Sequence, residues 1–185
     1  MNTSIITKFA GSYSNPDVFE YVLTYVSKKN YIGGCALFYP LTRDSVIKQY
    51  YMAEENSLYN TEHRIWHFSV SVSKVRSHRR LLLLGEKIAM LFASQYQVYY
   101  SLELKPGKYH LHFAVNAFSY HPEVQPLTEP IFDQYLEAIK VVLLQEFPTH
   151  MPQIIFKECF TLQYLHKNSA LFGSELSATA ISSSM

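Results

Sequence analysis

The stretch that decides the fold is VYYSLELKPGKYHLHFAVNAF, residues 98–118. Its two halves, residues 98–104 and 109–118, are rich in the aromatic and β-branched side chains that strands prefer. Between them stands Lys105-Pro106-Gly107-Lys108, and a Pro-Gly pair marks a tight turn. The stretch therefore predicts a β-hairpin, and it is the clearest hairpin in the sequence.

The second strand of this hairpin alternates between apolar and polar side chains. Successive side chains of a strand point to opposite faces, so the polar ones share one face. These polar residues are His110, His112 and Asn116. Two histidines two residues apart on a strand form a natural pair of metal ligands.

The length of the turn determines what lies opposite the histidines. With a loop of two or four residues, Glu103 pairs with His110 and Ser101 pairs with His112, and paired side chains share a face. Glu103, His110 and His112 then converge, whereas a three-residue loop would separate them. Two imidazoles and a carboxylate bind divalent ions and leave positions open for a substrate oxygen. A hairpin with scattered histidines and no metal explains the same residues, so that alternative stays open.

The composition predicts one globular domain. The chain has 185 residues, of which 48% are hydrophobic, and its formal net charge is +1. This balance excludes the strongly basic and strongly acidic classes, so any nucleic-acid site must be a local patch. Two cysteines, Cys35 and Cys159, make no disulfide framework, and the amino terminus lacks a signal peptide. The longest apolar stretch, residues 81–92, is too short for a membrane span, so we expect a cytoplasmic protein that does not insert into membranes.

Periodicity and turn residues predict an alternation of strands and helices. Strands are expected at residues 4–9, 31–39, 64–73, 98–104, 109–118 and 153–160, and helices at 16–29, 43–56, 78–95 and 131–147. This order predicts an α+β domain with a central antiparallel sheet, the His-x-His hairpin in its middle, and helices packed on one or both faces. We expect strand 64–73 to be half-buried. The apolar residues of helix 78–95 run nearly all round, so we expect this helix to be well covered. The domain is expected over residues 1–165, followed by a weakly ordered tail at 166–185.

Residues 110–116, HLHFAVN, resemble the His-hydrophobe-His strand of the HUH endonucleases. The surrounding sequence is similar to conjugative relaxases of the mobilisation-protein type, which nick one DNA strand at a transfer origin. Residues 25–29, YVSKK, resemble the nucleophile motif of that family. Residues 66–72, WHFSVSV, resemble its His-x-x-x-Ser-Phe strand, with Val72 in place of the usual Phe. The resemblance covers about residues 5–120.

One position departs from the family pattern. Seven residues before the first histidine of the pair, where these relaxases usually carry a third histidine ligand, this chain has Glu103. A subgroup of mobilisation relaxases is similar in mixing His, Glu and Asn over the three ligand positions. The resemblance thus implies a divalent metal held by Glu103, His110 and His112, with Mg²⁺ or Mn²⁺ expected and Zn²⁺ as the alternative. An inactive relative with the same fold is left open.

The family's reaction is attack of a tyrosine hydroxyl on a DNA phosphodiester, which yields a 5′-phosphotyrosine and a free 3′-hydroxyl. Tyrosine has a pKa of about 10 and is a poor nucleophile at neutral pH, so a cation must stabilise the developing charge. The motif match points to Tyr25 as the nucleophile, with Tyr21 one helical turn earlier as the fallback. A core stripe of Val18, Tyr21, Val22 and Tyr25 at helical spacing explains the same tyrosines without catalysis.

Supporting residues are predicted beside these motifs. His67 and Ser71 share the polar side of their strand, where His67 would support the metal or take a proton and Ser71 would hold a phosphate. The alternative for both residues is that they face solvent and have no functional role. Further DNA contacts are expected from a strand asparagine, a lysine pair and a basic run, namely Asn116, Lys28, Lys29, Lys74, Arg76, His78, Arg79 and Arg80.

Together these features predict a small, metal-dependent, relaxase-like nuclease of a mobile element. It would act on single-stranded DNA at a transfer origin, with accessory mobilisation proteins as further partners. A first alternative is a rolling-circle replication initiator or single-tyrosine transposase, whose nucleophile follows the His-x-His strand, a place that Tyr135 holds. A second alternative is a non-catalytic DNA-binding protein that kept the fold.

Overall fold

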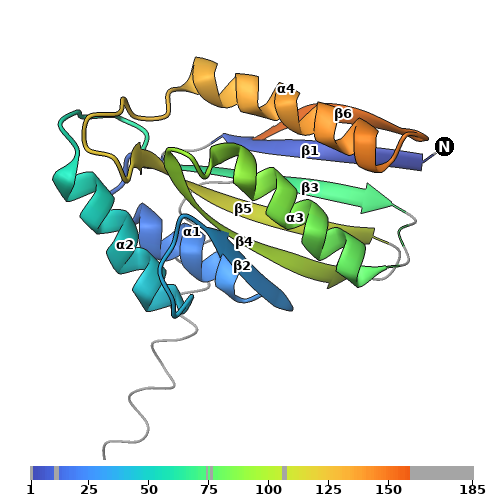
Figure 1. Ribbon diagram of the computed structural model, residues 1–185, viewed down its shortest axis with the longest axis horizontal. Coiled ribbons are helices and arrows are strands. Elements are labelled where there is room, and N and C mark those ends of the chain that lie inside the picture. Colours follow the sequence, from blue (N-terminus) through green and yellow to red (C-terminus); the bar gives the residue numbers. More distant parts are fainter. Residues whose placement is uncertain (1, 11–12, 74, 76, 106–107, 159–185) are drawn as a thin grey trace, which may run out of the picture.

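The computed structural model describes residues 2–10, 13–73, 75, 77–105 and 108–158, and this part of the chain forms an α+β fold with a six-stranded sheet and four helices (Figure 1). The expected tail at 166–185 lies outside the described residues. In chain order the elements are β1 (Asn2–Ala10), α1 (Val18–Ser27), β2 (Tyr31–Cys35), α2 (Arg43–Asn56), β3 (Ile65–Ser73), α3 (His78–Phe92), β4 (Tyr96–Lys105), β5 (Lys108–Ser119), α4 (Glu129–Glu146) and β6 (His150–Glu158).

The strands are ordered β2-β4-β5-β3-β1-β6, so β5 lies in the middle of the sheet. Neighbouring strands are antiparallel except β1 and β6, which run parallel. The sheet is therefore mixed, and the expectation of an antiparallel sheet is wrong at this edge. The reason is a crossover, because β5 and β6 run in the same direction and α4 carries the chain between them across one face (Figure 1).

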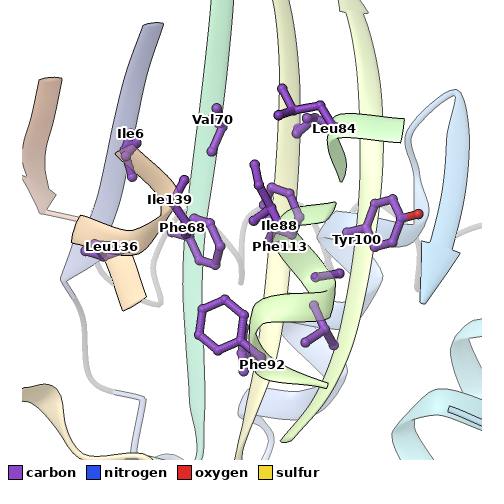
Figure 2. Packing of buried hydrophobic residues seen from close by; sticks show 14 of the residues in the cluster. Ile6, Phe68, Val70, Leu84, Ile88, Phe92, Tyr100, Phe113, Leu136 and Ile139 are labelled. Carbon is purple, nitrogen blue, oxygen red and sulfur yellow. The ribbon is translucent and has the colours of Figure 1, made fainter. Parts of the chain in front are cut away.

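One face of the sheet is covered by α3 and α4, which lie in front of the strands in Figure 1. Figure 2 shows the core beneath them. Phe68 of β3 and Phe113 of β5 stack with their ring centroids 4.6 Å apart, and they lie near Phe92 of α3 and Leu136 of α4. Burial of these large side chains is the main source of stability for this face.

The opposite face carries a second core beneath α1 and α2. Its members come from both helices and from the middle strands, and they include Phe19, Leu23, Tyr50, Tyr99 and Ala114. Helices therefore pack on both faces. As a consequence β3 is not the half-buried strand that was expected, since His67 and Ser69 on its polar side are buried as well.

Helix α3 is amphipathic rather than apolar all round. Its buried residues follow one stripe at helical spacing, namely Leu81, Leu84, Gly85, Ile88, Ala89 and Phe92. Leu83 and Met90 are exposed, so this helix is less covered than expected. Gly85 lets the buried stripe approach β4 closely, because a Cβ atom there would lie 2.8 Å from the ring of Tyr100.

Strand β2 ends at Cys35, earlier than the strand expected at 31–39. The chain turns away at Ala36, whose φ of 55° lies in the left-handed region. A side chain then supplies the next backbone hydrogen bonds. Gln49 of α2 accepts from Phe38 N at 2.7 Å and donates to Phe38 O at 3.1 Å. A helix glutamine thus replaces a strand partner for this segment.

The phenol of Tyr50 repairs an irregularity in the β4–β5 ladder. The register shifts between Tyr96 and Val98, which leaves the backbone around Gln97 without regular ladder partners. The Tyr50 hydroxyl accepts from Tyr99 N at 3.1 Å and lies 2.7 Å from the carbonyl oxygen of Ala114, to which it donates. Tyr50 therefore joins α2 to both strands of the hairpin.

We expect the Tyr50→Phe substitution to lower the free energy of unfolding by about 1–3 kcal/mol, because it leaves a buried amide and a buried carbonyl without their partner. Urea denaturation measures this difference. The control is Tyr39→Phe, which removes the hydroxyl of a tyrosine that is 85% exposed and should change little. Equal stability of the Tyr50 variant and the natural chain would contradict this role.

Candidate active site

The candidate site lies on the α1 side of the sheet, and strand alternation puts it there. Leu111 and Phe113 of β5 point into the core beneath α3 and α4. The intervening His112 therefore faces the opposite side, as does His110. His112 is buried and His110 is partly buried.

The pairing of β4 with β5 confirms the register that the turn arithmetic predicted. Glu103 pairs with His110, and Ser101 pairs with His112. On its other side β5 pairs with β3, where Ser71 is opposite His110. Because directly opposed residues share a face, each histidine has a serine as neighbour on an adjacent strand. The turn residues 106–107 lie outside the described residues.

The carboxylate of Glu103 is the centre of the charged contacts. Its Oε1 accepts from Lys29 Nζ at 3.0 Å, and its Oε2 accepts from Lys105 Nζ at 3.0 Å and from His112 Nε2 at 3.2 Å. Burial opposes ionisation of Glu103, but the hydrogen bonds from Lys29, Lys105 and His112 outweigh it and lower the pKa to about 2. Glu103 is therefore an anion at every physiological pH.

The imidazole of His112 is neutral near pH 7. Burial lowers its pKa to about 4, although the hydrogen bond to Glu103 works in the opposite direction. An ionised carboxylate can only accept, so in this arrangement Nε2 carries the proton. The other ring nitrogen, Nδ1, is buried and has no hydrogen-bond partner among the described residues. Neutral imidazole is the form that can bind a metal ion.

His110 is held by Ser71. The Ser71 hydroxyl lies 2.7 Å from His110 Nδ1, and burial followed by the charge of Lys105 lowers the pKa of this histidine. A partner on one ring nitrogen fixes the ring and leaves the other nitrogen available to a ligand. Ser71, predicted as a phosphate contact, therefore contacts His110 in this structure.

Tyr25 is brought to the histidines by α1. Its ring centroid lies 5.3 Å from that of His112 and 5.5 Å from that of His67. Lys29 Nζ lies 4.2 Å from the centroid of the same ring. The side chain is 37% exposed, whereas Val22 of α1 is buried, so Tyr25 is not the core residue of the alternative interpretation. Tyr21 lies one turn earlier and is partly buried.

His67 of β3 lies beside His112 and Tyr25 in the candidate site. It stacks on Phe9 of β1 with ring centroids 4.4 Å apart and lies 6.2 Å from His112. Burial, followed by the effects of His112 and Lys29, lowers its pKa to about 3. Its Nε2 atom is buried and unpartnered among the described residues. Because its pKa is so low, the His67 imidazole is better suited to orienting its neighbours than to accepting a proton near pH 7.

Several predicted DNA contacts are not brought to this site. Asn116 is fully buried, and its amide donates to Tyr50 O and to Gln97 Oε1, each at 3.2 Å, so it has a structural role. Arg79 and Arg80 begin α3, which covers the opposite face of the sheet. The guanidinium of Arg80 lies 4.6 Å from the ring centroid of Phe147 and contacts Glu146.

The other residues predicted to contact DNA are two lysines after α1 and three residues around the start of α3. Lys74 and Arg76 lie outside the described residues, and His78 packs edge-on against Tyr109 at 5.5 Å. Lys28 is exposed at the end of α1. Lys29, predicted as a DNA contact, instead turns inward to Glu103.

Tyr135, the nucleophile of the first alternative, lies on α4. It stacks on Phe92 with centroids 4.2 Å apart in the core beneath α3 and α4. The sheet therefore separates Tyr135 from the two histidines of β5.

Sequence reasoning missed Lys105 as a partner of Glu103. The sequence contained the signal, because Glu103 and Lys105 are two residues apart on one strand and therefore lie on the same face. It also missed Phe9, whose contact with His67 depends on the pairing of β1 with β3 and has no local signature.

The donor set of Glu103, His110 and His112 is chemically suited to a divalent ion, with one carboxylate, two neutral imidazoles and a buried ring nitrogen that lacks a partner. As the side chains lie, no group of three or more His, Cys, Asp or Glu residues in the described part of the chain is arranged to hold a metal ion. Both oxygens of Glu103 contact ammonium groups instead.

Comparison with known proteins adds no identity: no protein-family model, curated protein or solved structure matches the chain. Within the described residues, no helix is both long and apolar enough to cross a membrane.

We expect the metal-free protein to lose stability on acidification because of His67. In the unfolded chain this imidazole binds a proton below about pH 6.5. In the folded chain its pKa is about 3, so it stays neutral down to about that pH. Protons therefore favour the unfolded state, and stability is lost as the pH falls from about 6.5 towards 3. Between pH 7 and pH 5 the loss due to His67 is roughly 1–2 kcal/mol.

Urea unfolding in EDTA at pH 7 and pH 5 measures the effect. The His67→Gln variant should lose less stability between these pH values than the natural chain. The control is His121→Gln, which replaces an exposed histidine and should keep the natural pH dependence. An unchanged pH dependence in the His67 variant would refute the assignment.

Proposed function

We propose that this protein is a relaxase-like nuclease that nicks single-stranded DNA through a covalent tyrosine intermediate. The observation that carries the proposal is the meeting of three separate segments at one place. Tyr25 of α1 lies against both His67 of β3 and His112 of β5, and Glu103 of β4 lies beside them. Tyr25, His67 and His112 belong to the three segments that resemble the family's motifs, and Glu103 holds the position of the third ligand.

The proposed reaction is a transesterification. The Tyr25 hydroxyl oxygen attacks the phosphorus of a DNA phosphodiester, its O–P bond forms as the bond to the 3′ oxygen breaks, and a 5′-phosphotyrosine and a 3′-hydroxyl result. The phenol proton leaves with the departing 3′ oxygen or with solvent. Because the phosphoester bond is retained in the covalent link, attack by a 3′-hydroxyl reverses the step and rejoins the strand.

The residues around Tyr25 favour this step in separate ways. His67 and His112 orient the ring by edge contacts, and the Lys29 ammonium near the ring favours negative charge developing on the phenol. Glu103, His110 and His112 would hold a divalent ion, which would act as a Lewis acid on a phosphate oxygen. Mg²⁺ or Mn²⁺ suits the proposed reaction, and Zn²⁺ is the alternative.

The rival enzymes with a later nucleophile are less well supported. Tyr135 packs against Phe92 on the other side of the sheet, so the same sheet would have to admit DNA on both faces. The proposed partner is therefore single-stranded DNA at a transfer origin on the α1 side, in a cytoplasmic setting with accessory mobilisation proteins. A non-catalytic DNA-binding relative is the outcome to be tested against.

We expect Tyr25→Phe to abolish covalent adduct formation, because it removes the attacking oxygen while keeping the ring. The protein is incubated with Mn²⁺ and single-stranded oligonucleotides that cover the candidate origin of its own element, and adducts are resolved on a denaturing gel. The matched variant Tyr135→Phe should form adduct as the natural chain does. Adduct that persists in the Tyr25 variant and disappears in the Tyr135 variant would favour the rolling-circle alternative, and its absence from the natural chain would favour the non-catalytic one.

We expect Ser71→Ala to weaken Mn²⁺ binding about 10- to 100-fold, because the His110 ring loses the partner that fixes it. Isothermal titration calorimetry measures the affinity. Ser73→Ala serves as the control, since this serine lies on the same strand and contacts the backbone of Thr3 rather than a histidine. Equal weakening in both variants would show that Ser71 has no specific role.

A further inference from the structure

Lys29 is the cation at the centre of the site. Its side chain is only 13% exposed, and its ammonium lies between Glu103 Oε1 at 3.0 Å and the centroid of the Tyr25 ring at 4.2 Å. A buried ammonium is costly unless an opposite charge compensates it. Glu103, itself only 16% exposed, supplies that charge across 74 residues of sequence.

The same carboxylate is the sole anionic ligand of the candidate metal site, since His110 and His112 are neutral. His112 contacts Oε2 of this carboxylate and Lys29 contacts Oε1, so a divalent ion that binds both oxygens would take the one that Lys29 holds. Lys105 contacts the other oxygen, but its side chain is 56% exposed, so water can replace Glu103 as its partner at little cost. The two lysines thus differ in how strongly they resist removal from Glu103.

We propose that Lys29 is a resident cation that competes with the divalent metal for Glu103 and is released towards Tyr25 when the metal binds. This inference rests on the proposed function. In the metal-free chain, the Lys29–Glu103 pair keeps the carboxylate compensated and the end of α1 closed against β4. On loading, Glu103 transfers to the metal, and the Lys29 ammonium is free beside the nucleophile to contact a DNA phosphate. Metal binding would then release Lys29 and so make it available to a DNA phosphate in the same step.

The first test is the affinity of the 185-residue chain for Mn²⁺, measured by calorimetry. Lys29→Met keeps the aliphatic stem and removes the competing charge, so it should bind Mn²⁺ roughly tenfold more tightly than the natural chain. Lys105→Met is the matched control, since it removes a charge from the same carboxylate but from an exposed position, and it should change the affinity much less. Equal affinity of the Lys29 variant and the natural chain overturns the inference, as does equal tightening in both variants.

The second test uses the natural chain and does not depend on the folding of any variant. Acetylation of individual lysines by a soluble acylating reagent is followed by mass spectrometry with and without saturating Mn²⁺. The Lys29 rate should rise severalfold with Mn²⁺, whereas that of Lys87, which contacts Glu146 at the carboxyl end of α4, should stay constant. An unchanged Lys29 rate in a chain that binds Mn²⁺ overturns the inference alone. Failure of every form to bind Mn²⁺ overturns both the inference and the proposed metal site.

Discussion

A strand must point successive side chains to opposite faces, and β5 uses this constraint to serve two parts of the molecule. Its odd-numbered residues from Leu111 to Val115 belong to the core beneath α3 and α4, while His110 and His112 face α1. Because β5 lies in the middle of the sheet, the site is built on a strand that is paired on both sides, with a packed core on the opposite face. Moving β5 by one residue would turn His110 and His112 towards α3 and α4 and turn Leu111 and Phe113 towards α1, so the fold and the site depend on one register.

The charges of the site are arranged around a single carboxylate. Burial keeps His67 and His112 neutral, so Glu103 is balanced by the ammonium groups of Lys29 and Lys105. Neutral imidazoles and an ionised carboxylate are the protonation states in which such side chains bind a divalent ion. Both carboxylate oxygens of Glu103 therefore contact lysine ammonium groups in the metal-free protein.

Much of this could be predicted from local sequence. The pairing of Glu103 with His110 followed from a Pro-Gly turn and strand alternation, and the bounds of α2 matched because Thr42 caps the helix. The parallel placement of β6, the burial of Asn116 and the inward turn of Lys29 could not be predicted, because each depends on which elements pack together after the chain has folded. Strand pattern predicts which face a residue occupies, and only tertiary contacts decide what it meets there.

The central claim is that Glu103, His110 and His112 form a metal site beside Tyr25. An anomalous difference map from crystals of the 185-residue chain grown with Mn²⁺ tests this directly. We expect one peak in bonding contact with all three side chains, with the Lys29 ammonium moved away from Glu103. A map without a peak at these residues, from crystals that hold Mn²⁺ elsewhere, would contradict it.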